Sequence, residues 1–151
     1  MDEAMGESTV EYLKRTIEEL IERAANSVLG DRDYIALIGQ SWKVILMGSQ
    51  EYGLATDTSD YDFVLPLGEE AAAYAKEIRQ RFMASLVSQQ VSSKNQIRHE
   101  VSNDTVKWRD KQKACYVSLN VSHASKTRDA LAVTAWLKAC YCGFFLTGGP
   151  P

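Results

Sequence analysis

The chain has 151 residues, of which 45% are hydrophobic and 25% charged, an ordinary composition for a folded globular protein. This length suits one domain, or a little more than one, with a buried core. No apolar run approaches the ~20 residues of a membrane-spanning helix, and the acidic N-terminal segment has the features of neither a secretory signal nor a basic transit peptide. We therefore expect an intracellular protein with no membrane partner, cytoplasmic rather than mitochondrial or nuclear.

The net charge of −3 conceals an uneven distribution along the chain. Residues 1–70 carry 15 acidic and 5 basic side chains, whereas residues 71–151 carry 5 acidic and 12 basic ones. Two solvated faces of opposite sign would explain this pattern. A second explanation places metal-binding acids in the first half and phosphate-facing bases in the second. Both remain open at this point.

The three cysteines do not form a recognisable metal or disulfide framework. Cys140 and Cys142 are separated by one residue, which lacks the two-residue spacer of a zinc knuckle, and Cys115 stands alone. This usage favours a reduced, intracellular protein.

The first third of the chain predicts two helices and a strand. Residues 8–29 have apolar side chains at helical spacing, and Glu11 follows Ser8 by three residues, which is a capping-box signature. Residues 31–40 predict a short helical segment. Residues 41–47 predict a strand, and its continuous apolar end is typical of burial on both faces.

The middle of the chain alternates between helix and strand. Residues 49–54 predict the start of a short helix, and residues 60–65 predict a strand that Pro66 stops. Residues 69–87 predict one helix with a buried apolar stripe, and the polar residues 88–95 predict a loop.

The last third predicts three strands and a helix. The strand candidates are 97–101, 105–109 and 114–121, and the charged turn between the last two predicts an antiparallel hairpin. Residues 127–141 predict a helix, followed by a turn-rich tail at 143–151. The expected fold class is α+β, a mixed sheet backed by helices.

Two short motifs carry the chemistry. Gly48 and Ser49 follow an apolar run, and Asp60 and Asp62 open the next one. Side chains alternate along a strand, so the two carboxylates point the same way, about 6–7 Å apart along the backbone. Such a pair repels unless a cation lies between them, and hard oxygen ligands select Mg²⁺. Because a Gly-Ser turn offers N–H groups to phosphates, the pairing predicts a nucleoside triphosphate site.

These motifs resemble the nucleotidyltransferase (DNA polymerase β-like) superfamily, and within it the palm domain of noncanonical poly(A) polymerases and terminal uridylyltransferases. The resemblance is strong over about residues 40–65 and weaker from there to about residue 140. Small bacterial antitoxin-type nucleotidyltransferases share the paired motifs but usually differ between them. The residues that carry the resemblance are Gly48-Ser49, Gly53-Leu54 and Ser59-Asp60-Tyr61-Asp62.

The resemblance implies a role for each motif residue. Asp60 and Asp62 would hold Mg²⁺ or Mn²⁺ against the triphosphate of UTP or ATP and would serve catalysis at an RNA 3′ end. Ser49 would hydrogen-bond a terminal phosphate, Gly48 would admit the backbone to it, and Ser59 would belong to the same nucleotide-binding set. An N-cap role for Ser49 is compatible with this.

The chain departs from the family at a third carboxylate expected on a later strand. Asn120 occupies that position and takes its place in the predicted catalytic set. An amide offers a metal one neutral oxygen and cannot act as a base. We expect weakened metal binding and a large loss of rate, while triphosphate binding survives. Asp104 at a strand start and Asp110 at a hairpin tip are the nearest substitutes, and neither fits well.

Three segments follow from these patterns. Residues 1–30 form a helix packing on the palm, 31–125 form the palm, and 126–151 begin a truncated helical domain and end in a tail. The chain would then be a fragment, a truncated gene product, or a palm to which a protein partner supplies the rest of the helical domain that closes the cleft in this family. Lys126 is assigned to nucleotide binding, although such a residue is more often part of a charged first helical turn. The basic hairpin at 107–113 suits either RNA contact or a solvated face.

Three functions fit the sequence. The first is an RNA 3′-terminal nucleotidyltransferase that adds uridylyl or adenylyl groups. The second is a catalytically impaired homologue that binds nucleotide or RNA or supports a partner. The third is a small nucleotidyltransferase that modifies a protein or a small molecule.

Overall fold

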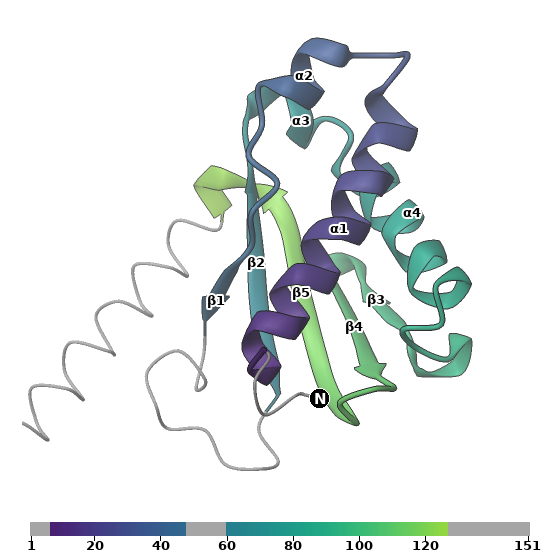
Figure 1. Cartoon of the computed structure of the whole chain (residues 1–151). Coiled ribbons are helices and arrows are strands. Elements are labelled where there is room, and N and C mark those ends of the chain that lie inside the picture. The colour runs from purple at the N-terminus through teal and green to yellow at the C-terminus, as the bar shows by residue number, and fades with distance from the viewer. Residues whose placement is uncertain (1–6, 48–59, 127–151) are drawn as a thin grey trace, which may run out of the picture.

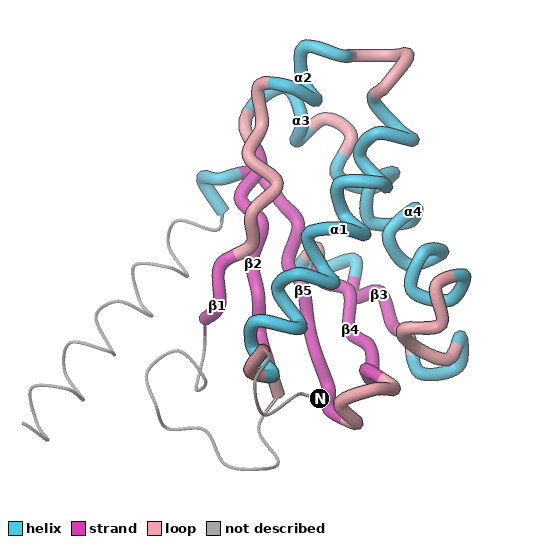
Figure 2. The backbone as a smooth tube through the Cα atoms, viewed as in Figure 1, coloured by secondary structure: helices cyan, strands magenta, loops and turns pink. Residues whose placement is uncertain are grey.

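The computed structural model describes residues 7–47 and 60–126, and its centre is a five-stranded sheet. In Figure 1 the two long helices α1 and α4 lie together on one face of that sheet. Figure 2 shows the strands in magenta, with the short helix α2 beyond one end of the sheet. The elements are α1 (Thr9–Leu29), α2 (Tyr34–Ile38), β1 (Ile45–Met47), β2 (Tyr61–Leu67), α3 (Glu69–Ala72), α4 (Ala75–Ser88), the 3₁₀ turn η3 (Lys94–Gln96), β3 (Arg98–Glu100), the 3₁₀ turn η4 (Val101–Asn103), β4 (Thr105–Asp110) and β5 (Cys115–His123).

The sheet is mixed. Its strand order is β1-β2-β5-β4-β3; β2 and β5 are parallel, and the other neighbours are antiparallel. The predicted hairpin of β4 and β5 is present, with Asp110 opposite Cys115. This architecture confirms the expected α+β class. None of the helices in the described part of the chain is both long and apolar enough to cross a membrane.

The predicted N-terminal helix is confirmed, together with its capping box. The Ser8 Oγ accepts the Glu11 N–H at 3.2 Å, and the Glu11 carboxylate accepts the Ser8 N–H at 3.0 Å. These two bonds satisfy N–H groups that a helix start otherwise leaves unpaired.

The hydrophobic core lies between the helices α1 and α4 and one face of the sheet. Because strand side chains alternate, every second residue of β2, β4 and β5 points toward the helices. Phe82 of α4 meets Trp108 of β4 edge-to-face, with 5.4 Å between ring centroids. The most deeply buried side chains of this core include Leu13, Ile17, Ile21, Leu29, Phe63, Leu65, Leu67, Ile78, Phe82, Leu86, Trp108 and Leu119.

The expectation that the strand at 41–47 is buried on both faces is wrong. The strand has only three residues, Ile45–Met47, and it stands at the edge of the sheet next to β2. Ile45 is 41% exposed, because its side chain lies on the face that no described helix covers. Two residues that precede the strand, Trp42 and Val44, are buried in the hydrophobic core.

The predicted single helix at 69–87 is two helices, α3 and α4, separated at Ala73–Tyr74. Tyr74 is tied to the α2 region: its hydroxyl lies 3.4 Å from the Asp33 carboxylate, and Arg32 lies over its ring at 5.1 Å. These contacts hold the Tyr74 ring against the segment that leads into α2, and the helix is interrupted at this point.

Strand β2 also continues through Pro66, which was predicted to stop it. Pro66 pairs in register with Ser122 of β5, and β1 has already ended on its other side. The missing N–H is tolerated where no neighbouring strand needs it. Gln40 caps this edge, donating to the Pro66 carbonyl at 2.9 Å and accepting the Gly68 N–H at 2.8 Å. The helices predicted at 49–54 and 127–141 lie outside the described residues.

Candidate functional site

The face of the sheet opposite the helices α1 and α4 carries the polar residues of the motif region. We call it the open face. Strand register arranges its side chains in rows that cross the sheet, and the row through Asp62 has Ser118, Lys107 and Arg98 on the next three strands. A cavity of about 520 Å³ lies on this face. Its lining includes Met47, Asp62, Val64, Asn103, Asp104, Thr105, Lys107, Ser118, Asn120, Ser122 and Lys126.

Asp62 enters this cavity from β2. Its carboxylate accepts a hydrogen bond of 2.6 Å from the hydroxyl of Ser118, its register partner on β5. Asp60 stands just before β2 and is exposed. It borders a neighbouring hollow that shares Lys107 with the first. Both carboxylates therefore border the same face, in agreement with strand alternation.

The paired carboxylates can supply some, but not all, of the ligands of a divalent cation. None of the ion pairs formed between described residues involves Asp60 or Asp62, so the charge of this pair is not neutralised there by a basic side chain. In the described ranges no group of three His, Cys, Asp or Glu side chains is placed to hold a metal. The two residues thus fit the oxygen-rich coordination of Mg²⁺ only if further ligands come from elsewhere, such as triphosphate oxygens.

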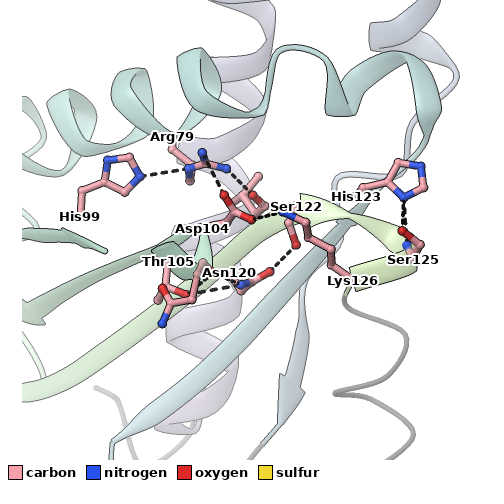
Figure 3. A network of polar contacts seen from close by, with 11 residues as sticks. Arg79, His99, Asp104, Thr105, Asn120, Ser122, His123, Ser125 and Lys126 are labelled. Carbon is pink, nitrogen blue, oxygen red and sulfur yellow. Dashed lines mark hydrogen bonds and ion pairs between the residues drawn. The ribbon is translucent and has the colours of Figure 1, made fainter. Parts of the chain in front are cut away.

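Asn120 of β5 lies on the open face opposite Val64 of β2, in the cross-strand row next to the row that contains Asp62. Its side-chain N–H group and its side-chain oxygen both have hydrogen-bond partners. The Nδ2 group donates to the Asn103 carbonyl at 2.6 Å and to the Thr105 hydroxyl at 3.3 Å. The Oδ1 atom accepts from the Ser122 hydroxyl at 2.7 Å, as Figure 3 shows. The surroundings are therefore matched to a neutral amide, whose N–H donors face acceptor oxygens.

The two other aspartates near this strand have different partners. Asp104 lines the cavity, but its carboxylate pairs with Arg79 at 3.3 Å and with Lys126 at 3.0 Å. Asp110 is fully buried and accepts the Lys113 N–H at 2.8 Å. Asp104 is therefore already neutralised, and Asp110 lies away from the open face. Neither replaces the missing carboxylate, as the sequence suggested.

A buried arginine supports this end of the site, and sequence patterns gave no sign of it. Arg79 of α4 donates to the Val121 carbonyl at 2.6 Å and to His99 Nε2 at 3.1 Å, beside its pair with Asp104 (Figure 3). Burial lowers the pKa of the Arg79 guanidinium, and Asp104 opposes that shift. Burial, followed by the charge of Arg79, lowers the pKa of His99. Arg79 thereby fixes the turn whose carbonyl holds Asn120.

The remaining predicted residues fall into two groups. Lys126 lies at the cavity, where it pairs with Asp104. Gly48, Ser49 and Ser59 lie outside the described residues, so their assignments stay predictions. His123 is a hydrogen-bonded surface histidine, with Ser125 at 2.7 Å and Glu69 at 3.0 Å (Figure 3 shows the first contact).

Comparison with known proteins shows which structures share this fold. No family model and no curated protein sequence matches the chain. Among solved structures, Cid1 RNA terminal uridylyl transferase superposes with a TM-score of 0.53 and 17% identity, over 91% of this chain and 37% of that one. The Cid1 poly(U) polymerase with bound MgGTP gives 0.54 and 16% over 91% and 38%. The chain has a nucleotidyltransferase palm fold.

A third match extends the likeness beyond Cid1. Terminal uridylyl transferase 4 from Trypanosoma brucei, with bound GTP, superposes with a TM-score of 0.50 and 12% identity, over 87% of this chain and 40% of that one. The palm described here thus spans about two fifths of the length of each of these structures. The resemblance found in the sequence is confirmed at the level of the fold.

Proposed function

We propose that this palm binds a nucleoside triphosphate, UTP or ATP, on the open face and transfers its nucleoside monophosphate to the 3′ end of an RNA. The observation that carries this proposal is the pair Asp60 and Asp62, placed on the open face of a palm sheet beside a cavity that can admit a small ligand. The palm-fold structures that it resembles include RNA terminal uridylyl transferases.

The proposed roles follow from the contacts. Asp60 and Asp62 would hold Mg²⁺ or Mn²⁺ together with the triphosphate, and Ser118 orients the Asp62 carboxylate through their 2.6 Å bond. Such a cation would offset the charge of the triphosphate, so that the 3′ hydroxyl can attack the α-phosphate and pyrophosphate can leave. Gly48, Ser49 and Ser59 would contact the phosphates, and Lys126 would approach the nucleotide from the far end of the cavity.

Base selection would require more than the palm. Since the described sheet spans only part of the structures it resembles, we propose that further chain or a protein partner closes the cleft over the nucleotide. A protein of this kind would act in the cytoplasm on RNA ends.

A second function is favoured by the surroundings of Asn120. All of its hydrogen-bonding groups are engaged with Asn103, Thr105 and Ser122, and it brings no negative charge to the carboxylate pair. This arrangement suits a homologue that binds nucleotide or RNA with little or no turnover. The two functions share the triphosphate site and differ in catalysis.

One experiment separates these functions. The chain is incubated with Mg²⁺, labelled UTP or ATP and a single-stranded RNA, and extension is followed on a gel. Extension by the wild type that disappears in Asp60→Ala/Asp62→Ala supports the transferase. Extension only by Asn120→Asp supports the impaired homologue.

Calorimetric titration with a non-hydrolysable UTP analogue gives the second readout. The transferase, and an impaired homologue that binds nucleotide, both require binding by the wild type and its loss, by at least about 100-fold, in Asp60→Ala/Asp62→Ala. Extension that persists in the double variant would refute the assignment of the metal site.

A further inference from the structure

A second hollow, of about 510 Å³, opens on the same face directly beside Asp60. It lies beyond the N-terminal end of β3, at Arg98, where β4 and β5 continue. Its lining is polar, basic and aromatic: Asn95, Gln96, Arg98, Lys107, Trp108 and Tyr116 complete it with Asp60. Of these residues only Asp60 has a role in the proposed nucleotide site, and only Lys107 also lines the first cavity.

An exposed aromatic ring forms one wall of this hollow. Tyr116 is 56% exposed on the open face, and its cross-strand partner Arg109 lies with its guanidinium 6.0 Å from the ring centroid. Register places Tyr116 one residue before the Tyr61–Val117 pair of β2 and β5, and therefore beside Asp60. An aromatic face next to a cation is a surface on which a nucleobase can stack.

Basic side chains outnumber acidic ones around this ring, and Asp60 is the acid that borders the hollow. Arg98 and Lys107 form a cross-strand pair, and Arg109 follows on the same face of β4. Of the acids in the same stretch, Asp110 is buried and Asp104 is paired with Arg79 and Lys126. Glu100 pairs with Lys107 at 3.4 Å and interacts with Arg98 at longer range, whereas none of the ion pairs within 4.0 Å between described residues involves Arg98 or Arg109.

We infer that this surface, formed by Arg98, Lys107, Arg109 and Tyr116 and here called the basic edge, binds the single-stranded RNA segment that leads to the 3′ end. This inference rests on the proposed function and assigns its acceptor. Tyr116 stacks on a base, while Arg98 and Lys107 contact phosphates. Lys107 borders both hollows, so an RNA on the basic edge ends beside Asp60 and Asp62.

The chemistry favours a single strand over a duplex. The bases of a duplex are stacked on one another and cannot stack on Tyr116. Three strand spacings, about 14 Å, separate Asp62 from Arg98 along their shared row. A short run of unpaired nucleotides covers that distance along the face.

The test measures binding of a 5′-fluorescein 15-nucleotide RNA by fluorescence anisotropy, with the whole chain and without nucleotide. Tyr116→Ala is expected to weaken binding about tenfold or more, and Tyr116→Phe, which keeps the ring, to stay within about twofold. Tyr34→Ala is the matched control, because Tyr34 is 61% exposed but belongs to α2.

The binding of phosphates is tested by salt dependence. Arg98→Ala/Lys107→Ala is expected to lower the slope of log affinity against log salt by about 1.4, or about 0.7 for each phosphate of a single strand that is no longer neutralised. The charge-matched control is Arg23→Ala/Arg81→Ala, at exposed positions on the helices, for which the slope is expected to stay constant.

Three outcomes would overturn the inference: no binding by the wild type, equal losses for Tyr116→Ala and Tyr34→Ala, or a duplex bound as tightly as the single strand. Nucleotide addition is scored separately. Binding that depends on Tyr116 without any nucleotide addition keeps the basic edge and contradicts the transferase. Nucleotide addition that does not change in Tyr116→Ala keeps the transferase and contradicts the basic edge.

Discussion

The two faces of the palm sheet use the same strands for different purposes. On β2, Phe63 and Leu65 point toward the helices and are buried, whereas Asp62 points to the open face and reaches a cavity. The same alternation on β5 separates Leu119 from Asn120. The covered face therefore stabilises the fold through apolar burial. The open face presents polar groups, and the stabilisation from the covered face offsets the free-energy cost of removing them from water. Neighbouring substitutions should separate stability from function.

The largest effect is expected on the covered face. Phe63→Ala removes a ring that is 1% exposed and should lower the free energy of unfolding by about 3–5 kcal/mol, because the cavity it leaves cannot fully collapse. Urea denaturation followed by circular dichroism measures this. The adjacent control, Asp62→Ala, should cost about 1 kcal/mol, mainly through the hydrogen bond from Ser118. Comparable losses in both variants would contradict the division between the faces.

Much of this fold could be predicted from local patterns. The apolar spacing and capping box of α1, and the period-two alternation of β5, are written in consecutive residues. The break between α3 and α4 could not be predicted this way, because the contacts of Tyr74 with Arg32 and Asp33 join residues about 40 positions apart. The edge position of β1 was missed for the same reason, since strand order is a tertiary property.

The second prediction concerns Arg79, a charged residue inside the region that the helices cover. Arg79→Met keeps the length of the side chain but loses the bonds to Val121 and His99 and leaves Asp104 with Lys126 alone. The free energy of unfolding should fall by about 2–3 kcal/mol. Thermal and urea unfolding measure it, with Arg81→Met, exposed on the same helix, as the control. An unchanged midpoint would mean that the buried cation is dispensable.

The candidate site was predictable only in part. Asp60 and Asp62 are close in sequence, so strand alternation alone placed them on one face. The partners of Asn120 are not local: Asn103 and Thr105 reach it through the pairing of β4 with β5, and Arg79 steadies their turn from α4. A sequence motif records which residue occupies a position, whereas the hydrogen bonds around it depend on the assembled sheet.

The third prediction tests whether the open face at position 120 is built for an amide. Asn120→Asp replaces an N–H donor that lies 2.6 Å from the Asn103 carbonyl with an oxygen. Two acceptors then face each other, and the free energy of unfolding should fall by about 1–2 kcal/mol at pH 7. The loss should shrink at pH 4, close to the ordinary pKa of an aspartate, because the protonated fraction of the carboxyl rises there and can donate again. A variant as stable as the wild type at both pH values would show that the site accepts a carboxylate freely.

The smallest effect is expected from pH, through His99 between α4 and β3. Burial and the neighbouring charge of Arg79 lower the pKa of His99, and its Nε2 accepts the hydrogen bond from Arg79 only while it is neutral. As the pH falls below about 6.5, the unfolded chain binds a proton at His99 before the folded chain does. The free energy of unfolding therefore decreases as the pH falls through this range and no longer changes, as far as His99 is concerned, once the folded state is protonated as well.

Urea midpoints between pH 7.5 and pH 5 should fall less in His99→Gln, which keeps an acceptor for Arg79 but does not titrate. Since every other residue is the same in both proteins, the difference between the two curves isolates His99. Parallel curves would mean that protonation of His99 costs the fold nothing, and that Arg79 is held by Val121 and Asp104 alone.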